Sequence, residues 1–307
     1  MTLPTPPRVY RSKPSRARLA LRRVLAGGLL LVFFGVALWL GVAAFGEIGE
    51  DDVAAPPPTT TRVAPKVPSL KIVFPEGFTR DEMITRVGVV RNIAQRKRKL
   101  TPKLSGATYA AATKAAKIPK QFRAHAKGIE GFLFPATYEF TAKTTAKRFV
   151  AEQLAFFEQN WAKVDLRDAK EKNLTPYDVL IIASMVEKET IAPEERAKVA
   201  AVIYNRLKAG MPLGIDATIR YGLDVPGTEA LRVSQLESDN PYNTRNRTGL
   251  PPTPIANPGL ASMQAAARPA KADFLFFVRK PDKIHHFFTA SESEFFAKAC
   301  EYGFGCG

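Results

Sequence analysis

The stretch that decides the fold is Thr175–Thr190, TPYDVLIIASMVEKET. It begins with a strong helix start signal. Thr175 is a capping residue, Pro176 suits the first helical position, and Asp178 stands at the third. The residues that follow are apolar on nearly every side of a helix as far as Val186. A helix of this kind is buried, so we expect it at the centre of a domain.

Two glutamates at the end of this helix are candidates for acid–base chemistry. Glu189 lies three residues after Val186 and seven after Ile182, which puts it on an otherwise apolar face. Burial there would raise the pKa of its carboxyl. Glu187 follows Ala183 at helical spacing and is a second candidate. Spacing alone leaves open that both glutamates are exposed at a frayed helix end, because charged side chains usually stay in water.

Hydrophobic periodicity and turn signals predict an α+β fold. Helices are predicted at 79–90, 107–118, 145–164, 195–210 and 293–303, and strands at 70–77, 273–280 and 284–290. The two later strands flank Pro281-Asp282 and read as a hairpin. Between them and the central helices the chain is irregular and rich in Gly and Pro. We therefore expect helices packed on antiparallel strands, with shaped loops beside them.

Charge and composition limit the function classes. The chain has 45 Lys+Arg against 29 Asp+Glu, a net charge of +16, which favours an anionic partner. Its three His and two Cys show no ligand spacing, so neither a metal site nor a cofactor is expected. No G-x-S-x-G or phosphate-binding loop is present. A carboxylate acid/base on a buried helix is what remains, with sugar as a plausible substrate.

The N-terminal segment predicts a membrane anchor. Residues 24–46 carry no charge and as a helix would span about 35 Å, against a bilayer core of about 30 Å. Residues 1–23 are basic and contain no acid, whereas acidic residues follow the run. Positive flanks stay in the cytoplasm, so the N-terminus is expected inside and the rest of the chain outside. The alternative is a cleaved signal peptide with its site at Val42-Ala43-Ala44.

Beyond the membrane segment three regions are predicted. Residues 47–69 form a Pro-rich linker, residues 70–127 a small αβ module, and residues 128–307 the main domain. Thr79 and Glu82 make a capping box at the start of the module's first helix. Cys300 and Cys306 lie outside the cytoplasm in this topology, where a local disulfide is as plausible as free thiols.

Several motifs together resemble one family. EGFLFPATY, ASMVEKET, ERAKVAAVIYNRL, DATIRYGL, PYNT, TGLPPTPIANPG, AAARPA and HHFFT stand in that order from Glu130 to Thr289. They are similar to the motifs of the MltG/YceG-like endolytic murein transglycosylases. VFPEGFTRDEMI at 73–84 is similar to a further segment of that family.

The resemblance implies an activity and a site. It implies cleavage of the MurNAc–GlcNAc β-1,4 bond within peptidoglycan strands, leaving 1,6-anhydroMurNAc ends and ending nascent strands beside the peptidoglycan synthases. The catalytic residue of the family maps to Glu189. Matching motif positions imply that substrate is bound by Thr190, Thr218, Tyr221, Tyr242, Asn243, Thr244 and His286. The partners so implied are glycan strands, the cell membrane and penicillin-binding synthases, without nucleic acid.

The sequence also departs from the family pattern. Members of the family often carry a LysM-like module near the membrane, and only about its second half is recognisable in 70–127. Binding of glycan by this module is therefore not implied. Arg268 stands where the family has His, and the segment after Phe288 lacks the usual Glu-His-Asn. Two alternatives therefore stay open: a non-catalytic peptidoglycan-binding scaffold of the synthesis machinery, and a hydrolase that uses water.

Overall fold

The computed structural model describes residues 68–304 of the chain. The predicted basic tail, membrane segment and linker at 1–67, and Cys306, lie outside these residues. Within 68–304 no helix is both long and apolar enough to cross a bilayer. The anchor at 24–46 and the Cys300–Cys306 disulfide therefore stay predictions.

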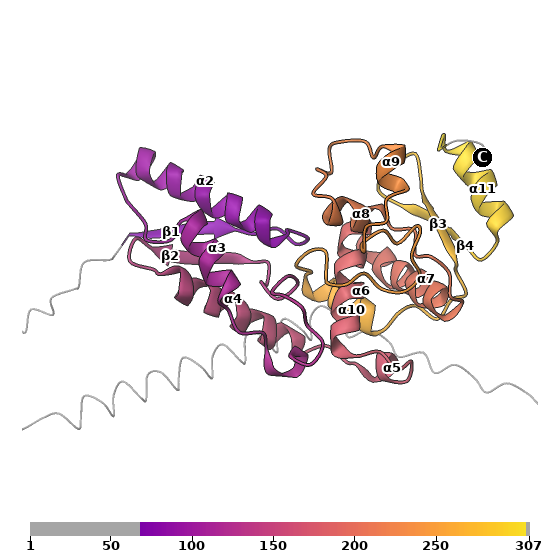
Figure 1. The fold of residues 1–307 in the computed structure, drawn as a ribbon, viewed down its shortest axis with the longest axis horizontal. Coiled ribbons are helices and arrows are strands. Elements are labelled where there is room, and N and C mark those ends of the chain that lie inside the picture. The colour runs from indigo at the N-terminus through magenta and orange to yellow at the C-terminus, as the bar shows by residue number, and fades with distance from the viewer. Residues whose placement is uncertain (1–67, 305–307) are drawn as a thin grey trace, which may run out of the picture. The chain divides into compact units, whose positions relative to one another are not determined.

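The first half of the described chain is a two-stranded sheet covered by helices (Figure 1). Strand β1 pairs antiparallel with β2, in a register that sets Ser69 opposite Thr141 and Val73 opposite Thr137. The elements are β1 (Ser69–Val73), α2 (Arg80–Arg98), α3 (Gly106–Lys114), a 3-10 turn (Lys120–Phe122), β2 (Thr137–Thr141) and α4 (Ala146–Trp161).

The β1–β2 pairing crosses the predicted boundary between residues 127 and 128. The module needs β2 as the partner of β1, and α4 packs against α3. A two-stranded sheet is stable only when a hydrophobic face is covered. Here the covering comes from rings that lie on both sides of the expected boundary. Phe149 of α4 contacts Phe74 and Tyr138, with ring centroids 6.2 and 5.3 Å away.

The second half consists of helices around α6, with a hairpin at one side (Figure 1). Helix α6 packs against α10, α7 and α8. The hairpin joins β3 and β4 and places Arg279 opposite His286. The elements are α5 (Arg167–Lys170), α6 (Pro176–Glu189), a 3-10 turn (Pro193–Glu195), α7 (Arg196–Lys208), α8 (Asp216–Gly222), α9 (Val233–Leu236), α10 (Leu260–Ala267), β3 (Phe276–Arg279), β4 (His286–Thr289) and α11 (Glu292–Glu301).

The two halves are joined by hydrogen bonds at one turn. Gly77 donates its N–H to the carbonyl of Asn257 at 3.0 Å, and Asn257 donates its own N–H to the carbonyl of Phe78 at 2.9 Å. The Asn257 side chain is buried and accepts a bond from the N–H of Leu133 at 2.9 Å. The turn after β1 is thereby fixed against the loop before α10. Mixed helices and two small antiparallel sheets confirm the α+β fold.

Candidate active site

Helix α6 presents Glu189 as its last residue, as its sequence predicts. The Thr175 hydroxyl accepts the N–H of Asp178 at 3.2 Å, and the Asp178 carboxylate accepts the N–H of Thr175 at 2.8 Å. Every residue from Val179 to Val186 is buried. At Thr190 the backbone turns extended, with φ −110° and ψ 122°. The helix therefore ends where its burial ends, with Glu189 at the edge of the core.

The Glu189 carboxyl has unusual surroundings. It makes no hydrogen bond or ion pair with any residue that the structure describes. Burial raises the pKa of Glu189 to about 7, and the negative charge of Asp216 adds to this. The positive charges of Arg279 and Lys188 act in the opposite direction. A carboxyl with this pKa can both give and take a proton near neutral pH, as a general acid–base must.

Thr190 adds a second unpaired group beside Glu189. Its side chain is buried, with 7% of the residue surface exposed. Within 68–304, its Oγ1 is the one buried side-chain nitrogen or oxygen without a hydrogen-bond partner. A buried hydroxyl without a partner costs about 1–3 kcal/mol. Such a group next to an unpaired carboxyl is typical of a site that a ligand completes.

Glu187, the other candidate, has a different environment. Its Oε2 accepts the N–H of Gly259 at 2.9 Å, and its Oε1 lies 4.0 Å from the guanidinium of Arg196. Its side chain is 6% exposed. Burial, and then the charge of Glu187, raises the pKa of the neighbouring Glu76. The Glu187 carboxylate is therefore committed to the start of α10, whereas that of Glu189 is free of protein partners among the described residues.

A third buried carboxylate, Glu130, was not singled out from the sequence. Its oxygens accept the N–H of Arg80 at 3.0 and 3.1 Å, the Asn257 amide at 2.7 Å and the Tyr221 hydroxyl at 3.2 Å. Burial raises the pKa of Glu130 to about 7, although these donors oppose the shift. Glu130 thus ties the start of α2 to α8 and to the loop before α10. Its position at the head of EGFLFP was the available signal.

Three of the predicted substrate residues lie below the surface. Thr218 and Asn243 are 0% exposed and Thr244 is 2% exposed. The hydroxyls of Thr218 and Thr244 are 3.0 Å apart, and the N–H of Ile215 is 3.0 Å from Thr244 Oγ1. The Asn243 amide donates to two carbonyls, those of Leu236 and Ser238. These bonds shape the loop around α8, and contact with sugar stays a prediction for these residues.

The predicted tyrosines form a pair beside Glu130. The rings of Tyr221 and Tyr242 are 5.2 Å apart at an angle of 60°. Tyr242 shares a hydrogen bond of 2.8 Å with the hydroxyl of Thr253. Both side chains are partly exposed. Tyr221 lies on α8, whose first residue, Asp216, acts on the pKa of Glu189. One ring of the pair therefore stands on the helix whose Asp216 acts on Glu189.

His286 is held inside the hairpin region. Its Nδ1 lies 2.8 Å from Glu195 Oε2, and its backbone N–H donates to both oxygens of Glu195 at 3.0 and 3.1 Å. The residue is 5% exposed. Its partner in the β3–β4 register is Arg279, whose charge lowers the pKa of Glu189. His286 therefore supports the strand that carries Arg279, and its predicted contact with substrate is untested.

Within residues 68–304, no group of three or more His, Cys, Asp or Glu side chains is arranged to hold a metal ion.

Known proteins give this geometry a context. Residues 59–300 match the YceG-like family. The chain is 38% identical over 152 residues to the endolytic murein transglycosylase of Bacillus subtilis strain 168, covering 50% of this chain and 42% of that protein. It is 32% identical over 223 residues to the endolytic murein transglycosylase of Streptococcus pneumoniae strain D39, covering 67% of this chain and 40% of the relative. The chain thus spans about two fifths of the length of these curated relatives.

A solved structure agrees with the sequence comparison. The crystal structure of a yceG-like protein from Listeria monocytogenes superposes with a TM-score of 0.60 at 30% identity, covering 73% of this chain and 74% of that one. With the family match extending over most of the chain, this protein belongs to the YceG-like family.

Proposed function

We propose that this protein is an endolytic peptidoglycan transglycosylase that cuts the MurNAc–GlcNAc β-1,4 bond with Glu189 as its acid–base. The observation that carries the proposal is the Glu189 carboxyl itself. It is desolvated, has a pKa raised to about 7, and has no protein partner among residues 68–304. The names of the two bacterial relatives support the same reaction class.

The proposed reaction needs one carboxyl in two states. Protonated Glu189 first gives its proton to the glycosidic oxygen as the bond from that oxygen to C1 breaks. The carboxylate then takes the proton of the MurNAc 6-hydroxyl as O6 bonds to C1, giving the 1,6-anhydro end. Glu189 is protonated again at the end of the cycle. No water and no second carboxylate takes part, which fits a site with one unpaired acid.

The setting of the reaction is part of the proposal. We place the chain in the bacterial cell membrane through residues 24–46, with the N-terminus in the cytoplasm and the described domain outside. Cuts within new strands would end their elongation, with peptidoglycan synthases as partners. The uncharged run, its basic flank and the cationic surplus of the chain support this placement.

Product analysis tests the reaction directly. The full chain in detergent and its Glu189→Gln variant are each incubated with purified sacculi, and the fragments are read by mass spectrometry. We expect anhydro-ended fragments from the wild type and none from the variant. Equal products from both would remove Glu189 from the acid–base role. No products from the wild type would favour the non-catalytic scaffold.

A second candidate, hydrolysis by water, is favoured by Asp216. Its charge acts on Glu189, so two carboxylates share this region. Its carboxylate accepts a hydrogen bond from the guanidinium of Arg245 at 2.7 Å. The same digest separates the candidates, because a hydrolase leaves reducing MurNAc ends in place of anhydro ends.

A further inference from the structure

A cavity of about 720 Å³ lies at the other end of α6 from Glu189. Asp178 lines it, eleven residues before Glu189, so about 16 Å of helix separate the two. The volume is within the range of small-ligand pockets, about 300–1,000 Å³. The cavity is thus distinct from the proposed acid–base site.

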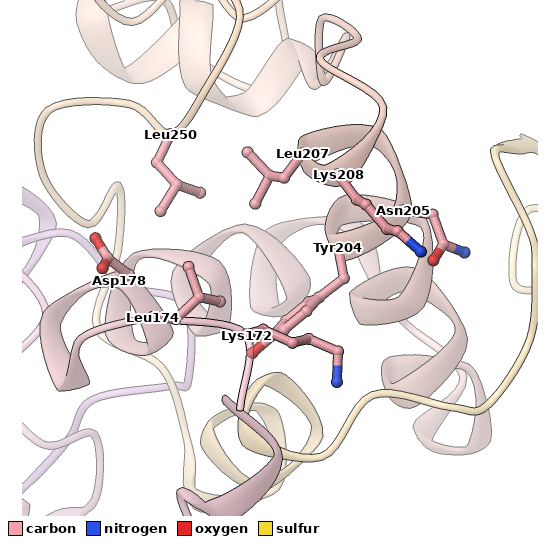
Figure 2. A pocket seen from close by; sticks show the side chains of 8 residues that line it. All are labelled: Lys172, Leu174, Asp178, Tyr204, Asn205, Leu207, Lys208 and Leu250. Atoms are coloured by element: carbon pink, nitrogen blue, oxygen red, sulfur yellow. The ribbon is translucent and has the colours of Figure 1, made fainter. Parts of the chain in front are cut away.

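The interior of this cavity is apolar. Leu174, Leu207 and Leu250 point toward a common space in Figure 2. Tyr204 lies beneath them, and its hydroxyl is already bonded to the carbonyl of Ala266 at 2.7 Å. A ligand here would therefore rest aliphatic or amide groups against the three leucines and the tyrosine ring.

Charged groups of opposite sign stand at the rim. Asp178 lies on one side of the leucines, and Lys172 and Lys208 lie on the other (Figure 2). Neither lysine has a carboxylate within 4.0 Å among the described residues. The Nζ of Lys172 is bonded to a carbonyl at 3.4 Å and lies 5.7 Å from the centre of the Tyr204 ring. Two ammonium groups are thus available to a carboxylate.

The cavity also offers a fixed hydrogen-bond acceptor. The Asn205 amide nitrogen donates to the carbonyls of Ala272 and Phe274, both at 2.9 Å. These bonds orient the amide, and its Oδ1 accepts no hydrogen bond from any residue within 68–304. Asp178 uses Oδ2 for the Thr175 cap. Acceptors beside ammonium groups suit a ligand that has both N–H donors and carboxylates.

A neighbouring hollow makes the site elongated. A second cavity of about 270 Å³ shares Lys172, Tyr204 and Asn205 with the first. It adds the carboxylates of Asp168 and Glu171 and the ammonium of Lys271. We call these two adjoining cavities, which share Lys172, the groove, and their linings carry both carboxylates and ammonium groups. That pattern favours an extended zwitterionic chain over a compact anion.

We propose that this groove binds the peptide stem of peptidoglycan, as a stem-recognition site separate from the cutting site. The assignment rests on the proposed function for its choice of peptide. Peptidoglycan stems are short peptides with free carboxylates, amide N–H groups and small apolar side chains, which match the lysines, Asn205 Oδ1 and the leucines in turn. The site would let the protein distinguish stem-bearing glycan from bare glycan.

The test measures peptide binding to the full chain in detergent. The probe is a synthetic stem peptide without sugar, titrated calorimetrically. The double variant Lys172→Glu/Lys208→Glu should weaken its binding at least tenfold. The matched control is Lys143→Glu/Lys147→Glu, which changes the same charge at exposed lysines away from the groove. It should stay within twofold of the wild type. A milder pair, Lys172→Gln/Lys208→Gln, serves if charge reversal impairs folding.

Three outcomes would overturn the inference. One is no saturable binding of the peptide to the wild type, and another is equal weakening by the control pair. The third is equal binding of an all-L peptide of the same composition, which would assign the groove to a protein segment.

One further measurement separates this inference from the proposed function. Glu189→Gln should bind the stem peptide as the wild type does while losing cleavage. Peptide binding without any cleavage of glycan by the wild type would refute the transglycosylase and leave the groove standing.

Discussion

Replacing Glu189 by Gln should make this protein more stable at pH 8 than the wild type. The wild-type carboxyl has a pKa of about 7 when folded, against 4.5 as its ordinary value. The folded state therefore binds more protons than the unfolded state between these values, and the free energy of unfolding falls as pH rises through them. The difference corresponds to about 3 kcal/mol at pH 8. Gln resembles the protonated carboxyl and does not ionise, so the variant avoids this loss.

The assay is denaturant unfolding of both proteins at pH 5 and pH 8. The gain from Glu189→Gln should reach about 3 kcal/mol at pH 8 and shrink strongly at pH 5, where the wild-type carboxyl is largely protonated. Glu158→Gln, at an exposed position of α4, is the matched control and should show no such change with pH. Glu130 titrates in the same range but is common to both proteins, so its contribution cancels. If the free energies of unfolding of Glu189→Gln and wild type differ by the same amount at both pH values, the pKa of Glu189 is not raised in the folded state.

Further outcomes follow from the same contacts. The rate of glycan cleavage should fall about tenfold per pH unit above about pH 7, because Glu189 must be protonated for the first step. A cleavage rate that does not change up to pH 9 would contradict this. Thr190→Val removes an unpaired buried hydroxyl, so thermal stability should hold or rise while cleavage falls, and unchanged cleavage would deny Thr190 a role. Asn257→Ala leaves the hydrogen-bonding groups of Phe78, Leu133 and Glu130 without their side-chain partner. The free energy of unfolding, measured with denaturant, should fall by about 3 kcal/mol or more. Gly259→Ala brings a Cβ against the end of the exposed, flexible Glu76 side chain, which can rotate away, so the melting temperature should change little, and a large fall would contradict this.

The capped helices and the hairpin could be predicted from the sequence because their signals are local, whereas α8 and α10 lie in the Gly- and Pro-rich stretch that was expected to be irregular. The Thr175–Asp178 and Thr79–Glu82 capping boxes occur where the sequence places them. The apolar run after Pro176 fixes the burial of α6. The pairing of β1 with β2 across residue 127 could not be predicted, because a strand reveals its length but not its partner. Nothing near Ser69 indicates that its partner is Thr141, 72 residues further along the chain.

The site was harder to read for the same reason. Helical periodicity does not decide between Glu187 and Glu189 as the catalytic acid, because the two residues lie two positions apart at the end of one helix. Their difference comes from Gly259 and Arg196, which reach Glu187 from elsewhere in the chain. Likewise, polar residues in family motifs such as Asn243 look like ligand contacts until their hydrogen bonds to nearby carbonyls are known.

Two carboxyls here share a pKa of about 7, and their surroundings decide which can act as the acid. Glu130 accepts bonds from Arg80, Asn257 and Tyr221, so protonating it would turn an acceptor into a donor among donors. Taking up a proton would therefore disturb hydrogen bonds that join the two halves of the fold. Glu189 has no such partners among the described residues, so moving its proton breaks no hydrogen bond there. A raised pKa alone does not identify a catalytic acid. A carboxyl that the protein leaves unpaired is better evidence, and Glu189 combines this with a pKa raised to about 7. Glu76 also has a raised pKa and no partner within residues 68–304, but it is exposed on the turn after β1.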